Sequence, residues 1–278
     1  MRLRIEMQAN VLNMGRTKIK NAKMIWHLLT DMDNQFVEMI DVFPPAKVLE
    51  RAESNMVAII KVPDLNPGEN FSPTVILRID TTTRDWLIEQ QTFTDLVKIQ
   101  NRGRFCSMQK YWEFETPAIQ QLSQSIAQRS DSDTKYARLA FEVVRDTLKL
   151  KTHMGERLGA HWAVTEKEGD CDEHADLFIA LTRAVRIPSR RVVGHYFKGE
   201  PEPEPHAWCE VFLEKIGWVP VDPALGRFGV LTENYFSRIR EGLVSQRPSI
   251  QLKMSITGSE APQLDETVNM TVLKNGQT

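Results

Sequence analysis

Apolar and polar side chains alternate along the first hundred residues of the chain. From Leu3 to Val11 every second side chain is apolar, which predicts a strand with one buried face. Shorter apolar runs follow, separated by turn-rich stretches, at residues 24–29, 36–42, 56–62 and 74–79. Several short strands at this spacing predict a β-sandwich. No titratable cluster stands out in this region, so we expect it to serve as a scaffold.

From residue 117 onwards the apolar positions recur at helical spacing. Pro117 suits the first turn of a helix, because that position needs no backbone N–H donor. The pattern predicts helices over residues 117–127 and 133–148, each with one apolar stripe. A third helix, over residues 172–185, is apolar around most of its surface, so we expect it to be buried. Pro188 ends it, since the residue before a proline disfavours the helical conformation.

Strand-like runs return after the third helix. They lie at residues 191–197, 207–213 and 218–221, and a proline-stiffened acidic loop over residues 200–205 separates the first two. Towards the C-terminus, we predict a helix over residues 231–239 and strands over residues 250–256 and 268–273. The whole pattern predicts an α+β protein. We expect a β-rich domain over residues 1–105 and a catalytic domain over residues 106–278.

Length and charge narrow the classes of function. With 278 residues and a formal net charge of −2, the chain can bury a full-sized core but has no global field to attract nucleic acid or an acidic membrane. It begins without the apolar run of a secretory signal, and no segment is apolar enough to span a bilayer. The absence of a disulfide framework indicates free thiols in a reducing compartment, at Cys106, Cys171 and Cys209. We therefore expect a cytoplasmic protein that binds neither nucleic acid nor membrane.

Cys171 is the strongest candidate for a nucleophile. Gly169 and Asp170 give a flexible approach and a helix cap, which places Cys171 in the first turn of the third helix. Free N–H groups and the positive end of the helix dipole stabilise a thiolate there. The carboxylates of Asp170, Asp172 and Glu173 act in the opposite direction. We therefore expect a neighbouring base to supply much of the activation.

His206 and Asp222 complete the inventory of a nucleophile, its base and a group that orients the base. His206 begins a strand after a constrained loop, from where an imidazole can face a cleft. Asp222 ends the next strand, where its carboxylate can accept a hydrogen bond from the other imidazole nitrogen. Each residue alone is weak evidence, because a lone cysteine or histidine is more often structural. The order of helix start, strand start and strand end favours catalysis.

A zinc site is the competing use of the same residues. Cys171 and His174, together with His206 and Cys209, have the spacing of a four-ligand site. Residues three apart on a strand point to opposite faces, so His206 and Cys209 should not converge on one ion. We therefore expect no metal and no other cofactor.

Several further residues are candidates for the cleft. Trp162 and Trp208 are candidates to wall it or to donate an indole N–H to an oxyanion, although the backbone N–H of Cys171 is the safer donor. His195 and Tyr196 lie on the strand before the acidic loop and are candidates to line the cleft, with core packing as an equal alternative. A group of arginines is expected by default to form a solvated charged face: Arg183, Arg186, Arg190 and Arg191.

At these residues the chain resembles the transglutaminase-like superfamily. The matching blocks occur in the family's order and lie at residues 169–171, 177–190, 206–211 and 217–223. The resemblance extends over about residues 117–226, and the first hundred residues resemble, more loosely, the β-rich module of prokaryotic members. One departure is Cys209, where the family more often has a small residue.

The resemblance implies a papain-like α+β core, with helices packed on an antiparallel sheet, and a triad of Cys171, His206 and Asp222. It also implies acyl transfer, in which the thiolate attacks an amide, a thioester forms, and water or an amine resolves it. We expect a cysteine peptidase or amidase with a peptide or protein substrate, because hydrolysis needs no second substrate. Two alternatives stay open: a protein-glutamine γ-glutamyltransferase with an amine acceptor, and a non-catalytic scaffold.

Overall fold

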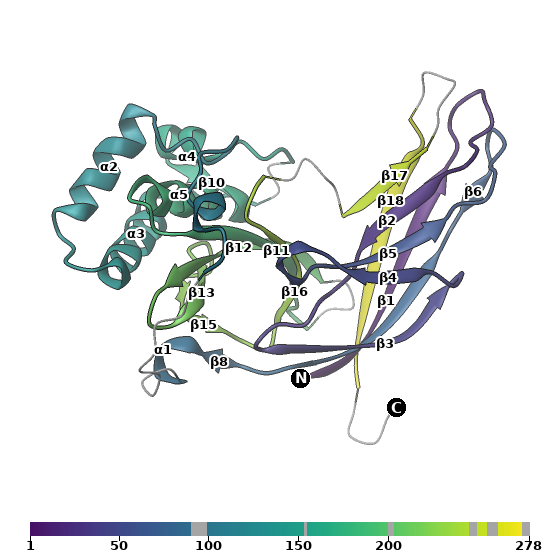
Figure 1. Ribbon diagram of the computed structural model, residues 1–278, viewed down its shortest axis with the longest axis horizontal. Helices are drawn as coiled ribbons and strands as arrows, with labels where there is room; N and C mark the ends of the chain where they lie inside the picture. The colour runs from purple at the N-terminus through teal and green to yellow at the C-terminus, as the bar shows by residue number, and fades with distance from the viewer. Residues whose placement is uncertain (90–98, 153–154, 200–202, 245–248, 255–260, 274–278) are drawn as a thin grey trace.

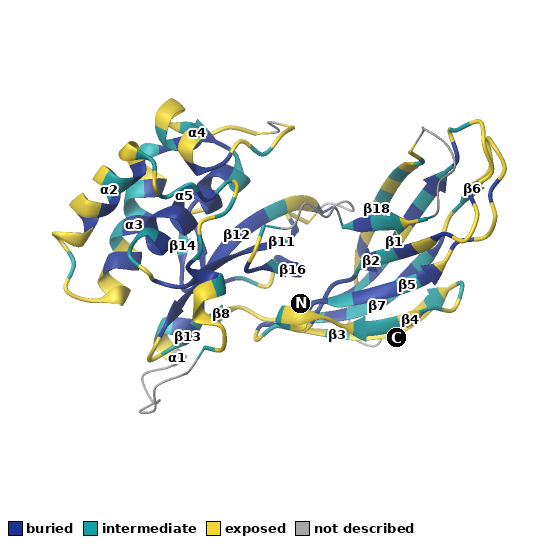
Figure 2. Ribbon diagram, turned by 45° about the horizontal axis from the view of Figure 1, so that its top comes forward, coloured by how far each residue is buried: buried dark blue, intermediate teal, exposed yellow. Residues whose placement is uncertain are grey.

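The computed structural model of the protein contains two hydrophobic cores. It describes residues 1–89, 99–152, 155–199, 203–244, 249–254 and 261–273. Helices gather at one end, a β-sandwich forms the other end, and a further sheet lies between them (Figure 1). Buried residues fill the inner faces of the sandwich strands and most of the central helix (Figure 2). Within the described ranges, no helix is long and apolar enough to cross a membrane.

The β-sandwich consists of two antiparallel sheets. The first has the order β18-β1-β7-β3, with β6 paired to β1, and the second has the order β17-β2-β5-β4. The alternation predicted for the first strand is confirmed, because its apolar residues are buried and their neighbours are more exposed. The bounds are β1 (Arg2–Leu12), β2 (Lys23–His27), β3 (Gln35–Phe43), β4 (Lys47–Glu50), β5 (Met56–Lys61), β6 (Asn70–Phe71), β7 (Thr74–Thr81), β17 (Ile250–Lys253) and β18 (Gln263–Val272).

The two C-terminal strands differ from the expected domain division. β17 pairs with β2, and β18 pairs with β1 along its whole length. Residues 250–253 and 263–272 therefore belong to the sandwich sheets and not to a separate domain over residues 106–278. An alternating pattern identifies a strand, but it does not identify the sheet in which the strand finds its partner. The boundary near residue 105 stays a prediction.

A central helix and the helices around it form the second core. The predicted helices over residues 117–127, 133–148 and 172–185 are confirmed to within two residues. The central helix, α5, packs against α2, α3 and α4 and against the sheet. The bounds are α1 (Trp86–Glu89), α2 (Pro117–Ala127), α3 (Asp133–Thr147), α4 (Ala160–Glu166) and α5 (Cys171–Ala184), with two short 3-10 helices, η1 (Ala52–Ser54) and η2 (Arg102–Phe105).

The sheet beside these helices is antiparallel, with the order β14-β13-β12-β11-β16. Helices on an antiparallel sheet, next to a β-sandwich, confirm the predicted α+β class. Of the predicted acidic loop, residues 200–202 lie outside the described part of the chain. The bounds are β11 (Ser189–Tyr196), β12 (Glu204–Leu213), β13 (Gly217–Asp222), β14 (Arg227–Phe228) and β16 (Tyr235–Glu241), and two small pairs are β8 (Arg84–Asp85) with β15 (Val230–Leu231) and β9 (Lys149–Leu150) with β10 (Glu168–Gly169).

The helix predicted over residues 231–239 is wrong. Residues 235–241 form β16, which runs antiparallel to β11. Both faces of β16 are buried: Tyr235 lies in the helical core and Phe236 lies in the sandwich core. A strand that is buried on both faces loses the alternation of polar and apolar residues, so its period does not identify it.

Met270→Ala tests the place of β18 in the sandwich. Met270 is buried opposite Ile5 on β1, so truncation should lower the free energy of unfolding by about 2–5 kcal/mol. The neighbouring Thr271 is exposed, and Thr271→Ala should change the free energy of unfolding by less than about 0.5 kcal/mol. Urea unfolding followed by tryptophan fluorescence measures both. Equal effects would contradict the packing of Met270 in the sandwich core.

Candidate active site

Cys171 is the first residue of α5, and a capping box fixes this end of the helix. A side-chain oxygen of Asp170 accepts from the N–H of Asp172 (2.8 Å), and Glu173 accepts from the N–H of Asp170 (3.1 Å). Gly169 is required before the cap, because a Cβ there would lie 2.3 Å from the Cβ of Glu173. The thiol is half-exposed at the end of a buried helix where backbone N–H groups are free.

The carboxylates next to Cys171 oppose a thiolate less than their number indicates. Asp172 forms an ion pair with Arg191. Burial alone would raise the pKa of Asp172, but Arg191 lowers it below its ordinary value. Burial raises the pKa of Glu173 to about 7, so its negative charge is partly suppressed near neutral pH. The cost of placing a thiolate at Cys171 is therefore smaller than the sequence indicates.

His206 and Asp222 face the thiol from the sheet. His206 lies near the start of β12, and Asp222 is the last residue of β13. The imidazole Nε2 lies 2.7 Å from Oδ2 of Asp222. Cys171 lies close enough to His206 to raise its pKa, and Nδ1 is the nitrogen left to face the thiol. The structure thus brings the three predicted residues together, while their catalytic roles stay a prediction.

The two partners of His206 keep its imidazole protonated. Burial lowers the pKa of His206, but the hydrogen bond to Asp222, the charge of Asp222 and the interaction with Cys171 raise it to about 10. At neutral pH the side chain is therefore an imidazolium. An imidazolium beside Cys171 favours the thiolate, which is the nucleophilic form of the thiol.

Asp222 is fully buried and has three hydrogen-bond donors. In addition to His206, the hydroxyl of Tyr235 donates to Oδ2 (2.7 Å), and the N–H of Leu225 donates to Oδ1 (3.0 Å). Tyr235 is not among the predicted site residues, since it lies in the segment predicted to be a helix. A buried carboxylate without donors is costly, and these three contacts give both oxygens of Asp222 a donor.

Two of the four predicted cleft residues lie against His206. The ring of Trp208 stacks on the imidazole with centroids 6.0 Å apart, and that of Tyr196 is tilted at 5.9 Å. Trp208 is fully buried, and its Nε1 has no hydrogen-bond partner among the described residues. Trp162 is half-buried on α4, and in the part of the chain that the structure describes no hydrogen bond or ring contact joins it to the triad.

His195 does not join the aromatic rings around His206. It precedes Tyr196 on β11, so the two side chains leave opposite faces of the strand. The charged neighbours of His195 are Arg238 and Glu266, which form an ion pair between β16 and β18. Burial, together with Arg238, lowers the pKa of His195 to about 4, which keeps this imidazole neutral at working pH. The geometry favours the packing alternative for His195.

Buried ion pairs tie α5 to the sheet, and the sequence analysis did not find them. Arg191 contacts both Asp172 and Glu241, and Arg157 binds Asp176 on the next turn of α5 (Nε–Oδ2 2.8 Å). Arg157 also lies 4.0 Å from Glu241. The default expectation of a solvated arginine face is therefore wrong for Arg183, Arg190 and Arg191, because their side chains are buried and bound to carbonyl or acidic groups inside the protein.

Two observations bear on metals and cofactors. The thiol of Cys209 lies in the core, and its Sγ donates to the carbonyl of Val221 (3.0 Å). His206, which shares the His206-x-x-Cys209 spacing of the zinc alternative, is instead hydrogen-bonded to Asp222. Within the described ranges, no group of three or more His, Cys, Asp or Glu side chains is arranged to hold a metal ion.

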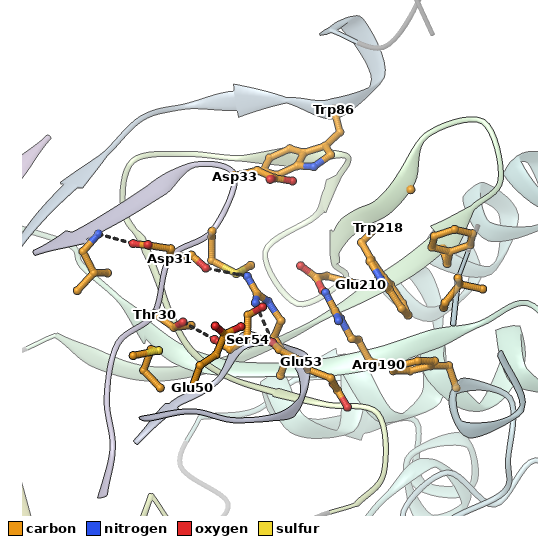
Figure 3. A pocket seen from close by; sticks show the side chains of 18 of the residues that line it. Thr30, Asp31, Asp33, Glu50, Glu53, Ser54, Trp86, Arg190, Glu210 and Trp218 are labelled. Carbon is orange, nitrogen blue, oxygen red and sulfur yellow. Dashed lines mark hydrogen bonds and ion pairs between the residues drawn. The ribbon is translucent and has the colours of Figure 1, made fainter. Parts of the chain in front are cut away.

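A cavity of about 950 Å³ lies between the sandwich and the sheet (Figure 3). Arg190 on β11 pairs with Glu210 on β12 and covers the ring of Trp218 at 4.1 Å. Arg240, which also lines the cavity, donates to the backbone carbonyl of Glu53 (2.9 Å). None of the triad residues lines this cavity, so we assign it no part in the chemistry.

Known proteins are similar to this chain in sequence over part of its length and in fold. Residues 120–223 match the sequence profile of the Transglutaminase-like superfamily, and this range includes Cys171, His206 and Asp222. This part of the chain is therefore similar to the Transglutaminase-like superfamily. No curated protein matches the chain in sequence.

A solved structure resembles this chain beyond residues 120–223. A candidate cysteine protease from Cytophaga hutchinsonii matches with a TM-score of 0.66 at 16% identity, over 100% of this chain and 93% of that chain. The periplasmic domain of TgpA from Pseudomonas aeruginosa matches with a TM-score of 0.46 at 12% identity, over 81% of this chain and 87% of that chain. The first match shows that the whole fold of this chain, the β-sandwich included, occurs in another protein.

Alkylation rates test the state of the three thiols. At neutral pH, iodoacetamide should modify Cys171 first, because it is half-exposed and paired with His206. Burial raises the pKa of both Cys106 and Cys209, so they should react only after unfolding. Peptide mapping by mass spectrometry at successive times gives the three rates. The protein unfolded in guanidinium is the control, and there the rates should converge. Equal rates of the three thiols in the folded protein would contradict the expected higher reactivity of Cys171.

Proposed function

We propose that the protein is a cysteine peptidase or amidase that hydrolyses peptide or isopeptide amides through a thioester on Cys171. The observation that carries the proposal is the His206–Asp222 pair (Nε2–Oδ2 2.7 Å) beside a half-exposed thiol at the start of a helix. The transglutaminase-like match supports a cysteine-dependent enzyme. The fold shared with a candidate cysteine protease agrees with hydrolysis.

Acylation begins from the ion pair of Cys171 and His206. The thiolate attacks the amide carbonyl carbon, and the carbonyl oxygen takes the negative charge. The backbone N–H of Cys171 lies in the first turn of α5 and is placed to stabilise this oxyanion. The C–N bond then breaks while His206 donates its proton to the leaving nitrogen. The products are a thioester on Cys171, a free amine and a neutral imidazole.

Deacylation uses the same imidazole as a base. Neutral His206 removes a proton from water, the resulting oxygen nucleophile attacks the thioester, and the C–S bond breaks. A carboxylic acid leaves, and the thiolate–imidazolium pair is restored. Asp222 holds the imidazole by Nε2 throughout, so that Nδ1 stays directed at the reacting atoms.

Substitution of the triad tests the mechanism. Cys171→Ala should abolish amide hydrolysis and leave the fold intact, because the nucleophile is lost. Asp222→Asn should lower kcat by about 10²- to 10⁴-fold, because the imidazole loses its orienting charge. A screen of peptide and isopeptide libraries supplies the substrate, and circular dichroism checks the fold. Cys106→Ala is the matched control, since this thiol contacts the carbonyl of Arg186 and not the triad. Turnover by the Cys171→Ala protein would exclude the thioester mechanism.

The fate of the thioester separates hydrolysis from transfer. With a glutamine peptide and a labelled primary amine, we expect free acid as the main product and little labelled peptide. His206 activates water in the same way as it would activate an amine, so the ratio of products reports which acceptor reaches the thioester. Mass spectrometry of the peptide measures this ratio. A labelled product in excess would assign the protein as a transferase, and no product of either kind with any peptide would favour a non-catalytic scaffold.

A further inference from the structure

We propose that Tyr235 is a positioning residue of this site: its hydroxyl shares Oδ2 of Asp222 with His206 and thereby limits how tightly the carboxylate holds the imidazolium. This inference deepens the proposed function and rests on it. Tyr235 touches neither the thiol nor the bond to be broken in the proposed mechanism. It acts through Asp222.

The geometry that supports the proposal is the sharing of one oxygen. His206 Nε2 and Tyr235 Oη each lie 2.7 Å from Oδ2 of Asp222. The other oxygen, Oδ1, accepts from the N–H of Leu225 (3.0 Å). The carboxylate is fully buried, so water does not supply a further donor. Removal of the hydroxyl would leave His206 as the one described donor to Oδ2.

Tyr235 is held in place for this contact. It is fully buried, and its ring packs edge-on against Tyr196 at 5.0 Å and against Trp208 at 5.3 Å. Burial and the charge of Asp222 both raise the pKa of Tyr235, so the hydroxyl stays protonated and always donates. The titratable or charged groups that face this unit come from five elements: Cys171, Asp172 and His174 on α5, Tyr196 on β11, Cys209 on β12, Asp222 on β13 and Arg227 on β14.

The role follows from the two tasks of His206. The imidazole must hold a proton before acylation and must be neutral to activate water in deacylation. A carboxylate that loses one of its donors attracts the remaining cation more strongly, which would raise the pKa of His206 further. The hydroxyl of Tyr235 therefore lowers the pH at which the imidazole can release its proton.

Nitrogen NMR of the histidine rings tests this without any substrate. In full-length protein labelled at histidine, the signal of His206 is assigned by its loss in His206→Gln. Tyr235→Phe should raise the pKa of His206 by about one unit, from the strength of a hydrogen bond to a charged group. Tyr196→Phe is the matched control. It also packs against His206 and Tyr235, its hydroxyl has no hydrogen bond among the described residues, and it should leave the pKa unchanged.

A second variant keeps the hydroxyl and should change the pKa of His206 in the opposite direction. Incorporation of 3-fluorotyrosine at position 235 makes the hydroxyl a stronger donor, and the pKa of His206 should then fall. In active enzyme, the acid limb of kcat should move with the measured pKa, to higher pH in Tyr235→Phe and to lower pH with fluorotyrosine. If Tyr235 had only a structural role, its substitution would change the stability of the protein and would leave the acid limb of kcat at the same pH.

The outcomes separate this inference from the proposed function. Asp222→Asn must lower the pKa of His206, and if it does not, the triad pairing and the proposed function both fail. If Asp222→Asn lowers the pKa while Tyr235→Phe leaves it unchanged or lowers it, the role of Tyr235 is refuted and the triad stands. If the titrations follow the expectation but no amide is cleaved, the coupling of Tyr235 to His206 holds and the proposed function is refuted.

Discussion

The burial of the Asp222 carboxylate is the constraint on which the rest of the site depends. A charge without access to water needs donors from the protein, and Asp222 takes them from three places in the fold. His206 comes from β12, Leu225 from the turn after β13, and Tyr235 from β16. These donors meet only if the strands keep the order β13-β12-β11-β16. Burial alone would lower the pKa of His206, and the contact with Asp222 raises it. The imidazole therefore depends on the strand order that brings Asp222 to it.

The same requirement for compensation governs the helix that carries the thiol. The first turn of α5 is acidic, and each carboxylate there has a partner that lies outside the chemistry. Asp170 caps the helix, Glu173 closes the capping box, and Asp172 is neutralised by Arg191. Cys171 is left as the half-exposed group to which His206 can couple. The acidic side chains at this end of the helix are thus each bound by partners within the protein.

Features that depend on local pattern could be predicted from the sequence, and features that depend on strand pairing could not. The alternation in β1 and the cap before Cys171 each depend on a stretch of about ten residues, so both could be predicted from the sequence. Arg191 and Tyr235 act through partners on other elements, and no spacing in the chain reports such contacts. Tyr235 carries a further difficulty, since β16 is buried on both faces and lacks a period. The position of β18 in the sandwich could not be predicted for a related reason, because an alternating pattern does not show which strand pairs with it.

The sandwich takes part in the site through β16. Tyr235 points into the helical core, whereas the next residue, Phe236, lies in the sandwich core. Gln35 of the sandwich accepts from the N–H of Ser237 (2.9 Å) and donates to its carbonyl (3.0 Å), which fixes the same strand from the other side. The strand that supplies a donor to Asp222 is thus held between the two cores. A fragment without residues 1–105 would lose these contacts to β16, so the part of the chain that must fold to hold the triad includes the sandwich.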